Sequence, residues 1–450
     1  MKDNRLHEGL LLFVYTIFLL LVLSFVPLPS EGFFNFKKIR LLADIEKTPE
    51  PEEPVLAEMP AVQPELPAEM KNVLCPKGQV CLEDFSPEGN GLENFIRQIK
   101  QSSKRHVRIG FYGDSFIEGD ILTAGLRDSL QRIFGGRGQG FVPVYSEVAS
   151  FRNTIRHEFE NLENKSIVGR YSSEPSFGPS GQVVRAMEDN FILYKPGKNN
   201  LNLEPATLLY ASEKEGKLNV SVNDTIENEF TLLPEKTVGQ ISLIKSNASS
   251  LKIRLNPEDS VDLFGIIFEG RAGIYVDNLA MRGNSGLGLT RIPSSKLSRM
   301  NQIRPYHLII LQFGLNVVGE NDSTNYSWYV SGMLRVVNHF KKSFPESSLL
   351  LLGISDRSTN MNGEFKTMEG VLRMRTAQRK IAKQSGILFW DLFEAMGGEN
   401  SMVKFSSALP PLAGKDHTHL NSRGGQIMAG KLAKALLFEI NRYEKPADLR

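Results

Sequence analysis

Residues 108–120 read Arg108-Ile-Gly-Phe-Tyr-Gly-Asp-Ser-Phe-Ile-Glu-Gly-Asp120, and this stretch decides the fold. A short apolar run breaks at Gly-Asp-Ser and passes into an amphipathic segment, which predicts a strand, a turn and a helix over 121–134. Ser115 would then follow a buried strand and lie at the start of that helix, where unpaired backbone N–H groups favour negative charge. A hydroxyl in that position is a candidate nucleophile. A serine nucleophile needs a base, a carboxylate that orients the base, and donors for a developing oxyanion.

The alternation of strand and helix returns after residue 273. Apolar runs predict strands at 273–280, 306–312, 348–353 and 387–391, and helical patterns occupy 328–344, 367–384 and 423–441. This order predicts an α/β domain, built from 75–145 and 275–450, with a parallel sheet covered by helices on both faces. In such sheets the reactive loops gather at the carboxyl ends of the strands, so the residues directly after each strand are the candidates for chemistry.

Residues 146–274 have a different character. Short runs alternate apolar and polar residues between Asn, Gly, Pro and Asp, at 217–222, 229–233, 240–244 and 250–255. The pattern predicts an antiparallel all-β domain, a β-sandwich, inserted into the α/β domain. Binding of an extended ligand, such as a carbohydrate, and packing support for the first domain are both open as its role.

The N-terminus carries a candidate membrane anchor at 9–28. Gly9 to Val26 is eighteen residues without a charge, preceded by Lys2 and Arg5. Such a run is just long enough to span a bilayer as a transmembrane helix, with the remainder exported to the periplasmic or cell-surface side. A cleaved signal peptide is the alternative, but no small-x-small cleavage site follows. Residues 29–74 are rich in Pro and Glu and predict a semi-extended stalk.

Composition excludes one class of partner and bears on the cysteines. The 450 residues carry 53 Lys plus Arg against 51 Asp plus Glu, with no long basic block, so nucleic acid is not expected as a partner. Cys75 and Cys81 are the two cysteines and have five residues between them. With no other Cys or His cluster to complete a metal site, a local disulfide is expected in an oxidising compartment, and two free thiols are the alternative.

A base for Ser115 can be sought among seven histidines. Five of them flank the anchor, precede strands at the wrong end of the sheet, or lie in the β insert or inside a helix. The loop before the last helix holds the other two, in Asp416-His-Thr-His419. Asp416 and His419 are three residues apart, a spacing that brings side chains together in a helical turn, whereas His417 would point elsewhere.

Two other strand ends offer donors for an oxyanion. Met281-Arg-Gly-Asn-Ser-Gly286 follows the strand at 273–280, and Phe313-Gly-Leu-Asn316 follows the strand at 306–312. Glycine lets the backbone approach a ligand closely, and Asn316 has a side-chain NH₂ that could point into the same cleft. Ordinary turn chemistry is the alternative for both.

These blocks together resemble the SGNH, or GDSL-type, hydrolases. Gly-Asp-Ser115, Gly283, Gly314-x-Asn316 and Asp416-x-x-His419 occur in family order, and the match covers about 105–140 and 273–440. The resemblance implies a three-layer α/β sandwich with Ser115 as nucleophile, His419 as general base and acid, and Asp416 as the residue that orients the imidazole. It also implies an oxyanion hole made of the backbone N–H groups of Ser115 and Gly283 with the Asn316 side chain, and no metal or cofactor.

A narrower resemblance is to peptidoglycan O-acetylesterases and related acetyl-transfer enzymes, which carry a β-sandwich in the same place. Gly113 to Asp120 follows their Gly-Asp-Ser-x-x-x-Gly-Asp wording, but the third block, Gly314-Leu-Asn-Val317, lacks the usual acidic neighbour. The resemblance implies a serine esterase or transferase acting on O-acetyl groups of a cell-envelope polysaccharide. The alternative from another class is a non-catalytic, membrane-anchored glycan-binding protein.

Overall fold

The structure is a computed structural model of the chain, and it describes residues 15–16, 75–198, 200–224, 226–319 and 325–443. The chain divides into two units, Met1–Leu66 and Pro67–Arg450, and the second is described below. The anchor expected at 9–28 and the stalk expected at 29–74 lie outside the described residues, apart from Tyr15 and Thr16, which are helical. None of the helices in the described ranges combines the length and apolarity that a membrane crossing requires.

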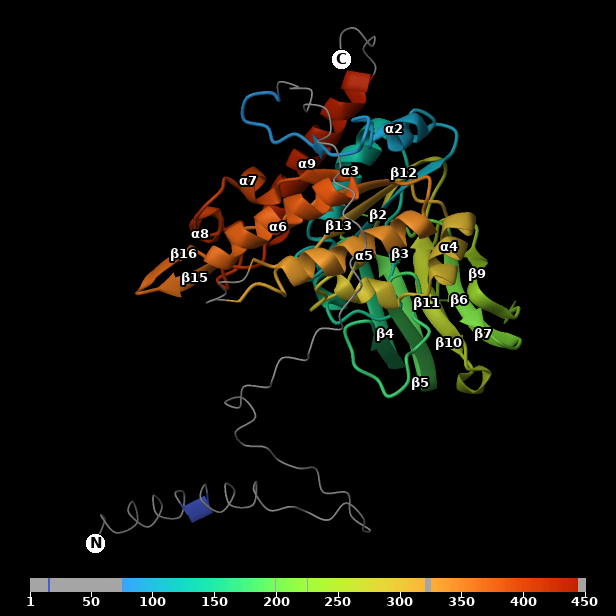
Figure 1. Ribbon diagram of the computed structural model, residues 1–450. Coiled ribbons are helices and arrows are strands. Elements are labelled where there is room, and N and C mark those ends of the chain that lie inside the picture. Colours follow the sequence, from blue (N-terminus) through green and yellow to red (C-terminus); the bar gives the residue numbers. More distant parts are fainter. Residues whose placement is uncertain (1–14, 17–74, 199, 225, 320–324, 444–450) are drawn as a thin grey trace, which may run out of the picture. The chain divides into compact units, whose positions relative to one another are not determined.

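A six-stranded sheet with five parallel strands organises the folded unit (Figure 1). Its spatial order is β1 (Glu83–Asp84), β17 (Leu388–Trp390), β14 (Ser348–Leu352), β13 (Leu308–Gln312), β2 (His106–Gly113) and β12 (Gly273–Ala280). Only β1, at the edge, is antiparallel to its neighbour. The sequence prediction of a parallel sheet is confirmed, and its four later strands match the expected ranges to within two residues.

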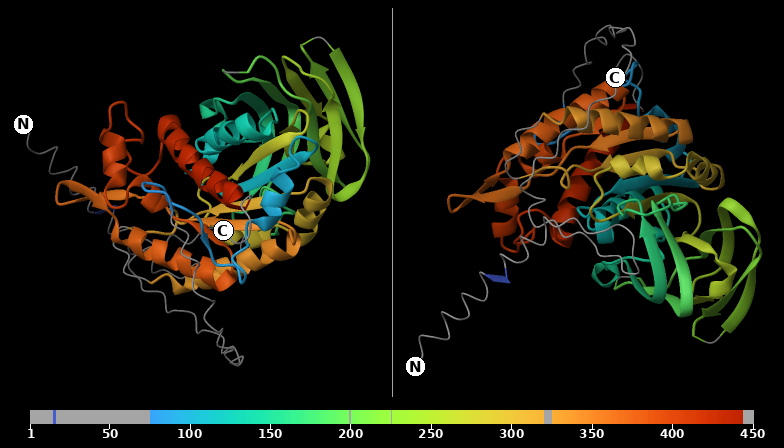
Figure 2. Two further views of the ribbon diagram at one scale, coloured as in Figure 1. Left: turned by 90° about the horizontal axis from the view of Figure 1, so that it is seen from above. Right: turned by 60° about the horizontal axis from the view of Figure 1, so that its bottom comes forward.

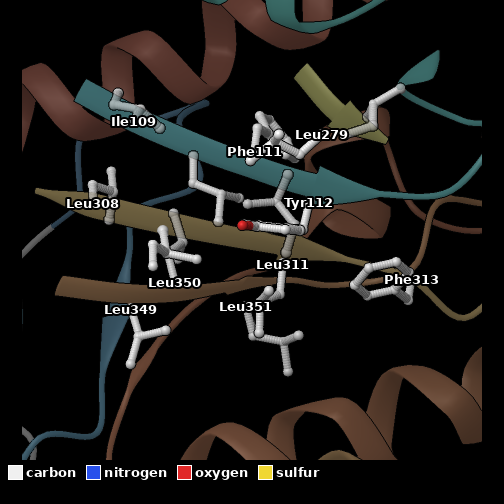
Figure 3. Packing of buried hydrophobic residues seen from close by; sticks show 14 of the residues in the cluster. Ile109, Phe111, Tyr112, Leu279, Leu308, Leu311, Phe313, Leu349, Leu350 and Leu351 are labelled. Atoms are coloured by element: carbon white, nitrogen blue, oxygen red, sulfur yellow. The ribbon is translucent and has the colours of Figure 1, made fainter. Parts of the chain in front are cut away.

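Continuous apolar strands fill the interior of this sheet. Every residue of β13 and β14 is buried, which is the pattern of strands covered on both faces. Figure 3 shows Leu308 and Leu311 of β13 beside Leu350 of β14 and Phe111 of β2. This packing belongs to one large hydrophobic core that also takes in the helices.

Helices cover both faces of the sheet (Figure 2). One face carries α3 (Thr123–Phe134) and α9 (Ser422–Tyr443), and the other carries α4 (Ser294–Ile303), α5 (Ser327–Ser343) and α6 (Glu369–Ser385). Shorter helices are α2 (Glu93–Ile99), α7 (Leu392–Met396) and α8 (Ser401–Ser407). The helices α3 and α9 lie very close, since a Cβ atom on Gly125 would come within 2.9 Å of the Ala429 Cβ atom.

Residues 140–268 form a second sheet, in which all pairs of strands are antiparallel. Its nine strands are β3 (Gly140–Val142), β4 (Ile155–Ser166), β5 (Gln182–Pro196), β6 (Ala206–Ser212), β7 (Gly216–Val222), β8 (Ile226–Leu232), β9 (Glu235–Ile244), β10 (Leu251–Leu255) and β11 (Asp262–Phe268). The sheet starts earlier than the range expected for the insert, because β3 pairs with β11. At the other end, β12 begins at Gly273 and belongs to the parallel sheet.

The long strand β5 explains how one sheet encloses a core of its own. Along one edge β5 pairs with β4 at both of its ends, with a register shift between them, while on its other edge Val184 pairs with β11 and Ile192 pairs with β10. The other strands therefore form two groups at opposite ends of that edge of β5, β10 with β7 and β8 near Ile192, and β11 with β6 and β9 near Val184. Their inward side chains, such as Ile192, Leu208 and Ile253, form a hydrophobic cluster separate from that of the parallel sheet.

The buried carboxylate of Asp120 joins the two sheets. It pairs with Arg127 of α3 at 3.2 Å and with Arg152, just before β4, at 2.9 Å. It also accepts hydrogen bonds from Thr123 and Thr154. Burial alone would raise the pKa of Asp120, but the two guanidinium groups outweigh it and hold this pKa far below the usual range.

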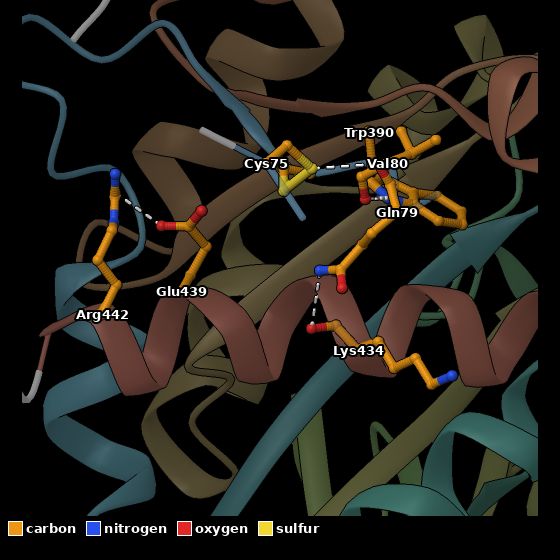
Figure 4. Close-up of a disulfide and its surroundings, with 8 residues drawn as sticks. Cys75, Gln79, Val80, Trp390, Lys434, Glu439 and Arg442 are labelled. Atoms are coloured by element: carbon orange, nitrogen blue, oxygen red, sulfur yellow. Dashed lines mark hydrogen bonds and ion pairs between the residues drawn. A yellow bond between two sulfur atoms is a disulfide. The ribbon is translucent and has the colours of Figure 1, made fainter. Parts of the chain in front are cut away.

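A disulfide links Cys75 and Cys81 at the start of the folded unit (Figure 4). The loop it closes rests on two elements from the far end of the chain. The Trp390 indole N–H of β17 donates to the carbonyl oxygen of Val80 at 3.0 Å, and the Gln79 side chain donates to the carbonyl oxygen of Lys434 in α9 at 3.4 Å. The N-terminal loop is thereby attached to both β17 and α9.

Replacing Asp120 should destabilise the whole folded unit. Asp120→Asn leaves the buried Arg127 and Arg152 without their counter-charge, and loss of one partner from a buried ion pair costs about 3–5 kcal/mol. Urea unfolding followed by tryptophan fluorescence should show a much lower midpoint. The matched control is Glu369→Gln, which removes an exposed ion pair with Arg373 and should leave the midpoint nearly unchanged. An unchanged midpoint for Asp120→Asn would contradict the stabilising role inferred for the Asp120 carboxylate.

Candidate active site

The turn after β2 places Ser115 at the carboxyl edge of the parallel sheet. β2 ends at Gly113, and the buried Asp114 carboxylate accepts a hydrogen bond from the Phe116 N–H at 2.9 Å, which fixes the turn. The expected position of Ser115 at the start of the following helix is wrong. Gly119 and Asp120 take left-handed φ values of 69° and 66°, and α3 begins only at Thr123. The N-terminus of α3 therefore offers no N–H groups to Ser115.

The loop before α9 brings the predicted histidine to this serine. His419 Nε2 lies 2.9 Å from Ser115 Oγ, although the two residues are 304 apart in sequence. His419 Nδ1 lies 2.7 Å from Asp416 Oδ2. An ionised carboxylate only accepts, so Nδ1 carries the proton and Nε2 is free to accept from the Ser115 hydroxyl. The three predicted residues thus form one continuous hydrogen-bonded chain.

Local hydrogen bonds shape the loop around Asp416. Its Oδ1 atom accepts from the N–H groups of Thr418 and His419, and the Gly414 N–H donates to the carbonyl oxygen of His419 at 2.8 Å. Partial burial would raise the pKa of Asp416, but the hydrogen bonds from the His419 ring and from the two backbone N–H groups outweigh it and lower this pKa. Asp416 therefore stays ionised and can stabilise a charged imidazole.

The candidate oxyanion donors lie at the ends of the two strands that flank β2. Gly283 follows β12 in a turn with a left-handed φ of 73°, which favours glycine. In the part of the chain that the structure describes, the backbone N–H groups of Ser115 and Gly283 donate no hydrogen bond to another protein group. These two N–H groups follow β2 and β12, whose last residues Gly113 and Ala280 pair with each other, so both groups lie at the same edge of the sheet.

The side chain of Asn316 is held by two groups that sequence reasoning did not assign to it. Its Nδ2 atom lies 3.3 Å from Asp114 Oδ2 and 3.1 Å from the carbonyl oxygen of Asn284. Asp114 therefore supports both its own turn and Asn316, in place of the acidic neighbour that the third block lacks. Asn284 stands directly after Gly283 in the second sequence block. This position is the feature of the sequence that could have pointed to its contact with Asn316.

Arg357 fixes the turn that carries Asn316. Its Nη1 atom donates to the carbonyl oxygen of Leu315 at 3.2 Å and lies 3.5 Å from that of Val318. Its neighbour Asp356 is buried and accepts from the Thr367 hydroxyl and the Met402 N–H. Both residues follow β14 at the active edge, and in this structure both hold loops in place.

His417 points away from the triad, as the spacing indicated. Its ring stacks on Phe365 with centroids 3.8 Å apart, and its Nδ1 atom lies 2.9 Å from Ser406 Oγ. His419 is therefore the histidine of this loop that reaches Ser115.

Comparisons with known proteins add the fold assignment. No protein-family model matches the chain, and no curated protein matches it. A solved structure of a peptidoglycan O-acetylesterase matches with a TM-score of 0.65 and 21% identity, covering 80% of this chain and 99% of that one. A family two carbohydrate esterase from Clostridium thermocellum, as an active-site mutant, matches with a TM-score of 0.28 and 11% identity over 62% of this chain and 98% of that one. A lipase/acylhydrolase from Enterococcus faecalis matches with a TM-score of 0.27 and 12% identity over 37% and 77%.

The first of these likenesses defines the class of fold. It extends over almost the whole of the O-acetylesterase structure, at a TM-score that the other two do not approach. The chain has the SGNH hydrolase fold, and the resemblance inferred from the four sequence blocks is confirmed at that level.

The buried Asp114 makes the stability of the protein depend on pH. Burial, against the opposing hydrogen bonds from the Phe116 N–H and Asn316, raises the pKa of Asp114 to about 7. Between about pH 4 and this value the folded state binds more protons than the unfolded state, so the contribution of Asp114 to stability decreases as the pH rises through this window. We expect the unfolding free energy of the wild type, minus that of Asp114→Asn, to fall over this range in urea titrations. A difference that does not change with pH would contradict the assignment.

Proposed function

We propose that the protein is a serine esterase of the SGNH type that acts on O-acetyl groups of a cell-envelope polysaccharide such as peptidoglycan. The observation that carries the proposal is the hydrogen-bonded chain from Ser115 through His419 to Asp416, with distances of 2.9 and 2.7 Å. A hydroxyl, an imidazole and a carboxylate in this order form the arrangement that activates a serine for attack on a carbonyl carbon.

The mechanism follows from the geometry. Ser115 Oγ attacks the carbonyl carbon of the acetyl ester while its proton passes to His419 Nε2, and Asp416 stabilises the charged imidazole. The N–H groups of Ser115 and Gly283 donate to the developing oxyanion. The Asn316 Nδ2 group, which donates to Asp114 and to the carbonyl oxygen of Asn284 in this structure, joins them when it exchanges one of these two bonds for the oxyanion. The tetrahedral intermediate then collapses, and the sugar oxygen leaves with the proton from His419. An acetyl-serine remains on the protein.

The second half of the reaction returns the serine. Water gives a proton to His419 and attacks the acetyl-serine, and His419 then returns a proton to Ser115 Oγ as the bond to the serine oxygen breaks and acetate is released. If a sugar hydroxyl attacks instead, the acetyl group is transferred to a glycan. The same residues serve both outcomes, so esterase and transferase activity differ only in the acceptor that reaches the acyl-enzyme.

The polysaccharide substrate is supported by the fold likeness to a peptidoglycan O-acetylesterase, which spans 99% of that chain. The insert offers a second support. A polar cavity of about 560 Å³ lies between β4, β5 and the loop that joins them, and its lining includes Arg170, Tyr171 and Arg185. That same loop reaches the site, since Val168 Cγ1 would be 3.5 Å from a Cβ atom on Gly283. These features favour a carbohydrate-binding role for the insert.

The cavity in the insert also favours the second candidate function, a non-catalytic glycan-binding protein. The two functions make opposite predictions for a fluorophosphonate probe, which reacts only with an activated serine. Labelling at Ser115 supports the esterase, whereas normal glycan binding without labelling supports the binding protein.

We further propose that residues 9–28 anchor the protein in a membrane and that the catalytic domain is exported. The uncharged run from Gly9 to Val26 supports the anchor, and the disulfide between Cys75 and Cys81 supports an oxidising compartment.

Removing the nucleophile or the base tests the esterase directly. Ser115→Ala or His419→Ala should lower the turnover of a chromogenic acetate ester by at least ~10³-fold, because each removes a member of the triad. Circular dichroism should show that folding is preserved. Ser407→Ala, which removes an exposed hydroxyl from α8, is the matched control and should keep full activity. Wild-type turnover in Ser115→Ala would end the proposal.

A mass-spectrometric assay separates hydrolysis from transfer. The protein is given an acetyl donor together with a glycan acceptor that carries no acetyl group. We expect free acetate if water is the acceptor and acetylated glycan if a sugar hydroxyl is the acceptor. Ser115→Ala should form neither product above background.

A further inference from the structure

An exposed aromatic ring lies beside the catalytic loop. Phe365 belongs to the short hairpin of β15 (Ser358–Met361) and β16 (Glu364–Thr367), and 41% of its surface is exposed. One face of the ring stacks on His417, with centroids 3.8 Å apart and planes inclined by 23°. Within the described ranges, Phe365 contributes to neither hydrophobic core. One face of the ring is therefore covered by His417, and part of the ring remains open to solvent.

The hairpin is held firmly at its base. A two-stranded hairpin of this length is not stable in water by itself. Here the buried Asp356 accepts from the hydroxyl of Thr367 at 2.8 Å, and Thr367 also exchanges two hydrogen bonds with Asn400. The Met368 N–H donates to the carbonyl oxygen of Arg357 at 2.9 Å. The strand that carries Phe365 thus ends in a fixed network.

His417 couples the hairpin to the catalytic histidine. The Ser358 N–H donates to the carbonyl oxygen of His417 at 3.1 Å, and Ser406 holds the ring of His417 through Nδ1 at 2.9 Å. His417 is two residues from His419, so their Cα atoms lie at most about 7 Å apart. The ring of Phe365 therefore stacks on a side chain of the same loop that carries the catalytic base.

We propose that Phe365, backed by His417, forms a sugar-binding subsite that selects polymeric glycans over small esters. A pyranose ring presents a face of C–H groups, and the negative face of an aromatic ring attracts such weakly positive hydrogen atoms. The open face of Phe365 stacks on a sugar unit near the acetylated one. The stack on His417 keeps the ring in place, so little conformational freedom is lost on binding. This subsite rests on the proposed esterase function.

Comparison of two substrates tests the subsite. Phe365→Ala should lower kcat/KM for acetate release from O-acetylated peptidoglycan by about 3- to 10-fold, the loss expected for one aromatic stack. Turnover of a chromogenic acetate ester should stay at the wild-type level, because that substrate is too short to reach the ring. Phe365→Tyr, which keeps an aromatic ring at this position, should retain the wild-type kcat/KM on the polymer. The same comparison is made with acetylated xylan as a second polymeric substrate.

Met361→Ala is the matched control. Met361 is also exposed, at 37%, on the same hairpin, but it pairs with Glu364 and so lies on the face opposite to Phe365. It should leave both activities unchanged. If Phe365→Ala alters both substrates equally, or neither, the subsite is overturned. It is also overturned if the wild type releases acetate from the small ester and from neither polymer. The esterase function stands in each of these cases as long as Ser115→Ala abolishes turnover of the small ester.

Discussion

The register of three parallel strands is the constraint on which the site depends. Gly113, the last residue of β2, pairs with Ala280 of β12 on one side and with Gln312 of β13 on the other. The three strands therefore end at the same level, and the turns that follow them carry Ser115, Gly283 and Asn316. A side chain at Gly113 would displace the buried Ile117, because a Cβ atom would lie 2.5 Å from Ile117 Cδ1. The glycine at position 113 therefore allows the turn after β2 to pack closely against the end of the strand.

The buried Asp120 gives the insert a structural part in this site. Asp120 stands five residues after the serine, and its partners come from α3, from β12 through Asn278, and from the chain entering β4. Moving a carboxylate and two guanidinium groups out of water is expensive, so the cluster is stable only while all its members are present. The insert is therefore part of the framework that shapes the turn after Ser115, besides any ligand it binds.

The sequence was most informative where the signal is local. Fully apolar runs identified the strands of the parallel sheet, and the Asp416-x-x-His419 spacing identified the base with its carboxylate. The sequence was misleading where one backbone angle decides the outcome, because nothing in the pattern shows that Gly119 and Asp120 turn left-handed and delay α3. It was silent on pairings between distant segments. The short strand β3 pairs with β11 more than a hundred residues later, and the contact of Asn316 with Asp114 joins residues 202 apart.

The way the triad is divided between two segments reduces what the fold must achieve. Asp416 and His419 share one loop, and local hydrogen bonds set their mutual geometry. Only the distance from His419 to Ser115 has to be fixed over a long range. The catalytic loop leads into α9 and the serine turn leads into α3. These helices touch closely at Gly125 and Ala429, and Gly425 of α9 has no room for a Cβ atom against the carbonyl oxygen of Ile121, just before α3. Packed helices resist displacement, so this contact holds the base and the nucleophile at a fixed separation. The small residues along the contact are therefore needed for the geometry of the triad.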